Sequence, residues 1–272
     1  MDAEYGTPTQ LTTRDDEDIY PAWSPDSTRI AFASSKPLTE LDIASGKIRN
    51  RRYLTILDIV SGTFHMPLMD TSDIDMDSRP DWSPDSASIV FTSAGHLYVA
   101  EADGSDWKQL MNAPPRVSYP SWSPNGNGII FDTCNHGDGQ IYRIHADGSN
   151  PESLFSDTTA QDCYPTWSPD GKFIAFTSTR DGQPDIYVMN YETGDVNRLT
   201  ETPEMEIAPT WSPDGTHIVF ARIHLGDTDC GVEFSCAIYI IDVTSHHEIA
   251  RTDGMGIAYA AMPHWGATRQ QK

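Results

Sequence analysis

The 272-residue sequence has no run of about 18 apolar residues, the length that a membrane-spanning helix needs. The segment from Met1 to Tyr5 is too polar for a secretion signal, and we expect that a natural signal is missing from this sequence. The sequence also lacks a G-x-S-x-G nucleophile elbow and a phosphate-binding glycine loop. These absences disfavour membrane insertion, a serine hydrolase and a nucleotide-binding site.

Positive charge is scarce as well. The chain has 18 Lys and Arg against 40 Asp and Glu, a formal net charge of −22. Nucleic acids and anionic membranes are therefore disfavoured partners, because both are bound through clustered positive charge. An acidic surface attracts cations, basic peptides or basic protein surfaces. A solvated acidic surface without a specific partner is the alternative.

One sequence motif recurs along the chain. It is clearest from Tyr164 to Phe176, which we interpret as a strand, the turn Ser-Pro-Asp-Gly and a second strand. Trp-Ser-Pro recurs at Trp23, Trp82, Trp122, Trp167 and Trp211, and a degenerate copy at Pro263 to Gly266 follows. In the middle of the chain the tryptophans lie 40, 45 and 44 residues apart. A period of roughly 40 to 45 residues with four strand-like runs is typical of a β-propeller blade.

The backbone preferences of proline and glycine explain the turn in this motif. Proline presets φ at the first turn position, and glycine takes the left-handed position that closes the hairpin. Ser27 and Ser86 replace this glycine in the first two repeats, so we expect those turns to be strained or of another type. The preceding tryptophan fills the wedge-shaped space between blades, so we interpret the motif as structural.

Pro-x-Trp-Ser-Pro-Asp-Gly, followed by Ala-Phe-Thr-Ser and by the run from Asp181 to Tyr187, resembles the TolB-like propeller repeat over essentially the whole chain. The resemblance implies an all-β, six-bladed ring forming one domain over residues 1–272. We predict five complete four-stranded blades and an incomplete sixth, closed by an N-terminal outer strand (residues 8–13) and a C-terminal inner strand at Trp265. Two strands of that blade are missing, so closure with five blades and a natural chain that begins further upstream both stay open.

Candidate ligand-binding residues come from the loops at one mouth of the channel. Five residues before the blade tryptophans stand the carboxylates Asp18, Asp77, Asp162 and Glu206. A ring of carboxylates is a predicted Ca²⁺ site, with Asp73, Asp75, Asp77 and Asp162 as ligands. Capping of loop amides is the alternative role. His264 and Asp81 stand between Pro and Trp, where a titratable side chain needs a partner.

A second possible metal site combines Asp132, His136 and Asp138 with His224, Asp227 and Asp229. Oligogalacturonate lyases, which have TolB-like blades, hold a metal through histidines, and the resemblance brings these residues to attention. The repeats that carry them are not neighbours, and no H-x-H or HExxH spacing is present.

The four cysteines fall near predicted loops. Cys134 and Cys163 are expected on the same face of adjacent blades, and Cys230 and Cys236 bracket one loop. Disulfides 134–163 and 230–236 are geometrically reasonable and would indicate an oxidising compartment, periplasmic or extracellular. Free thiols are the alternative.

These observations predict a non-catalytic binding scaffold that recognises a protein, peptide or glycan at an acidic channel mouth, as TolB-type propellers bind partner proteins. A metal-assisted polysaccharide lyase or hydrolase is one alternative. A propeller module of a larger multidomain protein is another.

Overall fold

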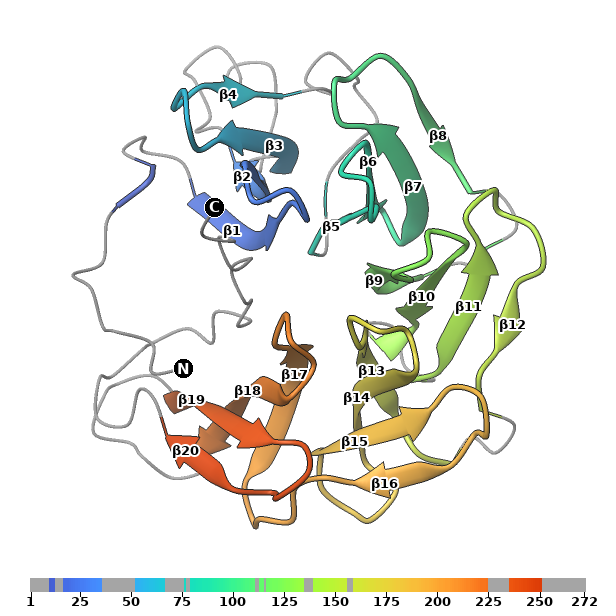
Figure 1. The fold of residues 1–272 in the computed structure, drawn as a ribbon. Helices are drawn as coiled ribbons and strands as arrows, with labels where there is room; N and C mark the ends of the chain where they lie inside the picture. Colours follow the sequence, from blue (N-terminus) through green and yellow to red (C-terminus); the bar gives the residue numbers. More distant parts are fainter. Residues whose placement is uncertain are drawn as a thin grey trace, which may run out of the picture.

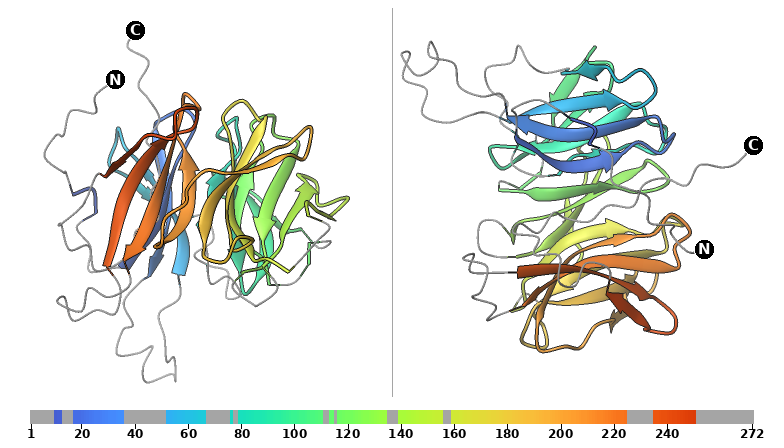
Figure 2. Two further views of the ribbon diagram at one scale, coloured as in Figure 1. Left: turned by 90° about the horizontal axis from the view of Figure 1, so that it is seen from below. Right: turned by 90° about the vertical axis from the view of Figure 1, so that its left-hand side faces the viewer.

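Five four-stranded antiparallel sheets stand around a common axis in the computed structural model (Figure 1). It describes residues 10–12, 17–35, 52–66, 76, 79–110, 113–114, 116–134, 139–155, 159–224 and 235–250. Viewed from the side, the strands run along the ring axis, so the turns gather on two opposite faces (Figure 2). In each sheet the strands follow chain order from the axis outward.

Each sheet is one repeat of the sequence. The strands are β1 (Glu17–Trp23), β2 (Arg29–Ser35), β3 (Arg52–Asp58) and β4 (Phe64–His65); β5 (Asp81–Trp82), β6 (Ser88–Ser93), β7 (His96–Glu101) and β8 (Trp107–Gln109); β9 (Ser118–Trp122), β10 (Gly128–Asp132), β11 (Ile141–His145) and β12 (Glu152–Ser153); β13 (Asp162–Trp167), β14 (Phe173–Ser178), β15 (Asp185–Asn190) and β16 (Val196–Arg198); and β17 (Met205–Trp211), β18 (His217–His224), β19 (Ser235–Asp242) and β20 (Glu248–Ala250). The four strands predicted in each of the five complete repeats are confirmed.

The hydrophobic core lies in layers between successive sheets. Trp82 packs with residues of the first and second sheets, and Trp211 with residues of the fourth and fifth. The second strands are buried along almost their whole length; in β14 every residue after Phe173 is buried. A strand covered on both faces must be apolar throughout, which explains why these runs do not alternate.

The prediction of a six-fold ring is wrong, because the described part of the chain forms five blades. Within the predicted outer strand of the sixth blade, residues 10–12 are described; they form no strand, and Leu11 is 50% exposed. A segment without a neighbouring strand has no ladder to join. The predicted inner strand at Trp265 lies outside the described residues.

The Ser-Pro-Asp turns have the same hydrogen-bonded form in every repeat, whether or not they contain glycine. Gly171 donates its N–H to the Ser168 carbonyl at 2.9 Å, and Ser27 does the same to Ser24 at 2.9 Å. Gly171 has φ +70°, and Ser27 and Ser86 have φ of 62° and 61°. The serine turns are therefore strained but not of another type, since a side chain in the left-handed region costs about 1–2 kcal/mol.

We predict that Ser27→Gly raises the free energy of unfolding by roughly 0.5–1 kcal/mol, because relief of the left-handed strain exceeds the added chain entropy of glycine. Urea unfolding measures the change. Ser86→Gly is the matched comparison: Ser86 Oγ accepts a hydrogen bond from the Asp26 N–H at 3.1 Å, so its gain should be smaller. Destabilisation by Ser27→Gly would contradict this account.

Candidate functional site

The Ser-Pro-Asp turns are held together by their own side chains. In the fourth blade Ser168 Oγ donates to Asp170 Oδ1 at 2.7 Å and accepts from the Phe173 N–H at 2.9 Å. The first bond recurs in the other blades, in the pairs Ser24–Asp26, Ser83–Asp85, Ser123–Asn125 and Ser212–Asp214. Hydrogen bonds from Ser212 and Thr216 lower the pKa of Asp214 to about 2. The turn carboxylates therefore serve the turns and are not free for a ligand.

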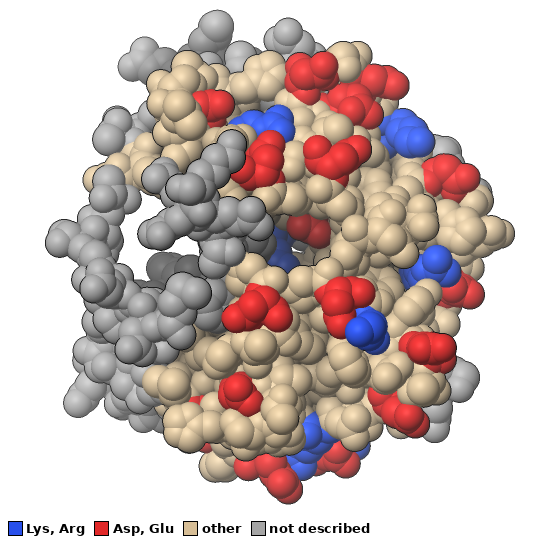
Figure 3. Space-filling view, in the orientation of Figure 1, with Lys and Arg blue, Asp and Glu red and all other residues tan. Residues whose placement is uncertain are grey.

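These turns surround an opening of about 330 Å³ at the ring centre. Its wall consists of blade tryptophans, turn prolines and the residues before the tryptophans: Trp82, Trp122, Trp167, Trp211, Pro25, Pro84, Pro124, Pro169, Asp81, Ser121, Thr166 and Thr210. Figure 3 shows the hollow, with acidic and basic atoms at its bottom. Its volume is in the range of ligand sites, roughly 300–1,000 Å³.

Asp81 is the one charged residue among those that form this wall. Its Oδ1 accepts the Trp82 N–H at 3.0 Å and its Oδ2 accepts the Trp122 N–H at 2.7 Å. Burial raises the pKa of Asp81 to about 6, and the hydrogen bond from Trp122 opposes the rise. The prediction that Asp81 needs a partner is confirmed, and above pH 6 its charge polarises the wall of the opening.

Arg79 lies deeper along the axis. Its Nη1 donates to Thr210 Oγ1, in the wall of the opening, at 3.2 Å. With Tyr119, Tyr164 and Ala208 it surrounds a cavity of about 10 Å³, space for one water-sized group. Burial lowers the pKa of Arg79 and raises the pKa of Tyr119 and of Tyr164, which keeps both phenols protonated at neutral pH.

Three residues that line this cavity have a strained backbone. Tyr119, Tyr164 and Ala208 have φ of 47°, 55° and 57°, and each precedes a proline within a bulge of the inner strand. A non-glycine residue in this region costs about 1–3 kcal/mol and persists only where the surrounding structure fixes it. Such strain is typical of ligand-binding positions.

The predicted carboxylate ring does not lie around this opening. Asp162 is buried and accepts from Arg180 Nη2 at 3.0 Å. Glu206, also buried, accepts from Arg222 Nη2 at 2.7 Å and from Thr202 Oγ1 at 2.6 Å. Both carboxylates thus neutralise an arginine of their own blade, a role that five-residue spacing could not indicate.

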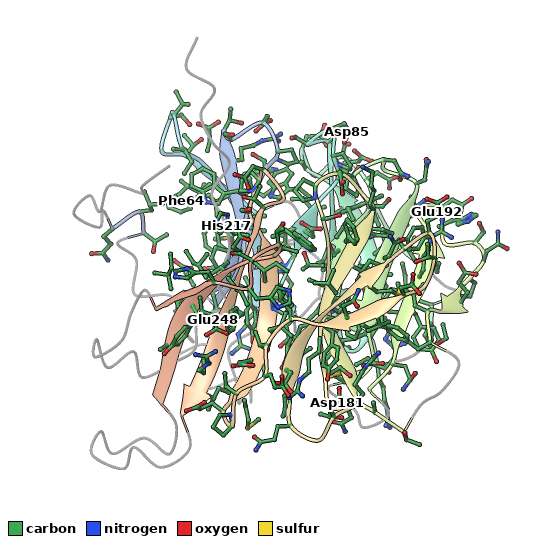
Figure 4. All side chains as sticks on the ribbon, turned by 60° about the horizontal axis from the view of Figure 1, so that its bottom comes forward. Phe64, Asp85, Asp181, Glu192, His217 and Glu248 are labelled. Atoms are coloured by element: carbon green, nitrogen blue, oxygen red, sulfur yellow. A yellow bond between two sulfur atoms is a disulfide. The ribbon has the colours of Figure 1, made fainter. Side chains whose placement is uncertain are left out.

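The other predicted ligand-binding residues give less information. Asp18 pairs through its backbone with Ser34 in the β1–β2 ladder. Asp77 and His264 lie outside the described residues. Figure 4 shows the two faces: Asp85, in a Ser-Pro-Asp turn, lies opposite Asp181, in the loop after β14.

The predicted metal ligands are not brought together in the described part of the chain, where no three His, Cys, Asp or Glu side chains form a metal-binding group. Asp73, Asp75 and Asp77 lie outside it, so the Ca²⁺ site stays a prediction. In the histidine cluster, Asp132 accepts from Ser118 Oγ and from the Tyr164 N–H, both at 2.7 Å. His136, Asp138, Asp227, Asp229 and the His224 side chain are not described.

The Cys134–Cys163 disulfide is confirmed, with the two Cα atoms 5.8 Å apart. It joins the loop after β10, in the third blade, to the inner strand β13 of the fourth blade. The Cys230–Cys236 pair cannot be placed, because Cys230 and the side chain of Cys236 lie outside the described residues.

Arg79 and the opening on the Ser-Pro-Asp face were missed by sequence reasoning, which placed ligands at the other mouth. One signal was present. Arg79 stands three residues before Trp82, where other repeats carry Tyr20, Tyr119, Tyr164 and Ala208.

Residues 44–235 match the family model of the TolB beta propeller domain. The chain belongs to the TolB beta-propeller family. No curated protein matches it.

Solved structures show the same fold. TolB from Acinetobacter baumannii is 23% identical, with a TM-score of 0.68 over 90% of this chain and 56% of that protein. A TolB protein from Agrobacterium tumefaciens is 19% identical, with a TM-score of 0.71 over 88% of this chain and 82% of the other. An oligogalacturonate lyase in complex with manganese is 15% identical, with a TM-score of 0.65 over 90% and 68%. The chain thus spans little more than half of the Acinetobacter TolB, and these likenesses concern the fold alone.

None of the described residues of this TolB-family propeller forms a helix long and apolar enough to cross a membrane.

We predict that the free energy of unfolding rises as the pH is lowered from 7.5 to 5. Burial raises the pKa of Asp81, Asp132 and Asp185 to about 6, 7 and 6, above the value of 3.8 for an exposed carboxyl. The native state therefore holds protons that the unfolded state releases, and the stability from these groups is lost as the pH rises through their folded pKa values. Urea unfolding at both pH values measures the effect.

Asp132→Asn, which cannot titrate, should show a smaller rise than the wild type. Repeating the titration in 0.5 M NaCl screens repulsion between surface carboxylates but hardly affects buried ones. Stability that is flat or falls toward pH 5 at both salt concentrations would contradict the assignment.

Proposed function

We propose that this TolB-family propeller is a non-catalytic scaffold that binds a segment of a partner protein in the opening of the Ser-Pro-Asp face. The observation that carries the proposal is the opening itself: about 330 Å³ at the ring centre, lined by four tryptophans and four prolines. Tryptophans and prolines have few rotatable bonds, so a wall built from them loses little entropy when a ligand binds.

The charge of the propeller indicates the kind of partner that it binds. The chain carries a formal net charge of −22, and Asp81 adds a carboxylate to the wall above pH 6. Such a field favours a basic protein surface and accelerates its association. The binding segment therefore belongs to a partner with a positive surface.

A periplasmic or extracellular location accompanies this proposal. Its support is the Cys134–Cys163 disulfide, since disulfides persist in oxidising compartments. The alternative, a metal-assisted polysaccharide lyase or hydrolase, is supported by the fold shared with a manganese-bound oligogalacturonate lyase, and fold alone does not carry function.

We predict that Thr166→Arg abolishes retention of a partner from a native extract, because the new side chain occupies the opening that Thr166 lines. Asn197→Arg, an equal charge change on the exposed outer strand β16, should retain it. Thermal unfolding verifies that both variants fold. Equal retention by both, or turnover of an oligosaccharide by the wild type, would refute the scaffold.

A further inference from the structure

The feature that the scaffold leaves unexplained is a cation at the ring axis. Among the described residues, Thr210 is the one hydrogen-bond partner of Arg79, and no carboxylate there lies at ion-pair distance from it, although the charge of Asp81 acts on it from further away. Arg79 is half-buried, and a guanidinium without a hydrogen-bonded carboxylate can bind an anion. Such a group stands out in a protein that has more than twice as many acidic as basic residues.

Three other arginines of the ring are neutralised. Arg180, Arg198 and Arg222 donate to the buried carboxylates Asp162, Asp185 and Glu206, at 3.0, 2.8 and 2.7 Å. The fold thus provides a buried acid for each of these guanidinium groups. Arg79 is different. Among the described residues the acid nearest to it in the sequence is Asp81, whose charge opposes the fall in the pKa of Arg79 but whose two oxygens accept the N–H groups of Trp82 and Trp122.

The surroundings of Arg79 suit an anion. A guanidinium has five N–H donors, and the bond to Thr210 accounts for one. Tyr119 and Tyr164 lie against the same small cavity, with ring centroids 4.5 Å apart, and their phenols are neutral hydrogen-bond donors. The cavity has space for one water-sized group, such as one carboxylate oxygen.

We infer that Arg79 anchors a carboxylate of the ligand that fills the opening, either the chain end of a peptide or an Asp or Glu side chain. The inference rests on the proposed function, since Thr210 belongs both to the wall of the opening and to the contacts of Arg79. Arginine binds carboxylates through two parallel hydrogen bonds, which also fixes the direction of the ligand. Asp81 opposes the binding of an anion, so the neutral part of the ligand must add contacts with the wall of the opening.

The test uses three probes on the intact protein. N-acetyl-alanine has a chain-end carboxylate, N-acetyl-alanine amide is its neutral counterpart, and N-acetyl-aspartate α-amide has only a side-chain carboxylate. We expect one or both carboxylate probes to shift the Arg79 Nε–H resonance in NMR spectra saturably, at least tenfold more tightly than the amide. Which acid binds more tightly identifies the source of the carboxylate.

Arg79→Gln should abolish this preference for acid over amide. Arg143→Gln, which removes an arginine paired with Glu152 on the outer strands, should keep it. Equal binding of acid and amide, or an unchanged preference in Arg79→Gln, would overturn the inference.

Partner capture separates this inference from the proposed function. If Arg79→Gln and wild type retain the partner equally while Thr166→Arg does not, the scaffold stands and the anchor fails. If Thr166→Arg also retains it, the opening is not the site, and both fail.

Discussion

A single extra residue in four of the five inner strands, β1, β9, β13 and β17, is the constraint on which the ring depends. In β13, Cys163 pairs with Thr177 and Thr166 with Ala175, so the inner strand has one residue more than its neighbour between these pairs. The bulge takes the Tyr164 N–H out of its own ladder. A buried N–H without an acceptor costs about 1–3 kcal/mol, and the preceding blade provides one: Asp132 Oδ2 accepts this N–H at 2.7 Å.

The same solution joins the next two blades, where the Ala208 N–H donates to Thr177 Oγ1 at 3.2 Å. One bond therefore links neighbouring sheets and holds a residue with positive φ beside the axis. The burial of Asp132 belongs to this arrangement, and it raises the pKa of Asp132 to about 7. Tyr164 and Ala208, whose N–H groups link neighbouring blades, also line the small cavity beside Arg79.

The features that could be predicted are those that depend on residues close together in the sequence. The second strand expected at the end of the motif from Tyr164 to Phe176 is present and runs from Phe173 to Ser178, because four adjacent residues specify the hairpin turn that begins it. The number of blades could not be predicted in this way, since a sixth blade depends on pairing between segments far apart in the sequence. Spacing also grouped Asp162 and Glu206 correctly but could not show that Arg180 and Arg222 neutralise them. Arg79 was visible as an exception in the repeat, but the sequence could not show that no described carboxylate forms an ion pair with it.

The proposed function combines two properties of the axis. The opening offers a rigid wall of tryptophans and prolines that carries the Asp81 carboxylate, and the small cavity offers the Arg79 guanidinium. A rigid wall favours tight binding, and two charges of opposite sign favour one orientation of the ligand. A propeller built in this way recognises a partner by the fit of one segment rather than by a broad interface.

Photo-cross-linking would identify the face of the propeller that binds the partner. A photoreactive residue would replace either Pro169, exposed at the rim of the opening, or Gln183, exposed on the opposite face of the same blade. The account predicts that the retained partner cross-links at position 169 and not at position 183. Cross-linking at position 183 alone would contradict it and would return the ligand to the face that the sequence first suggested.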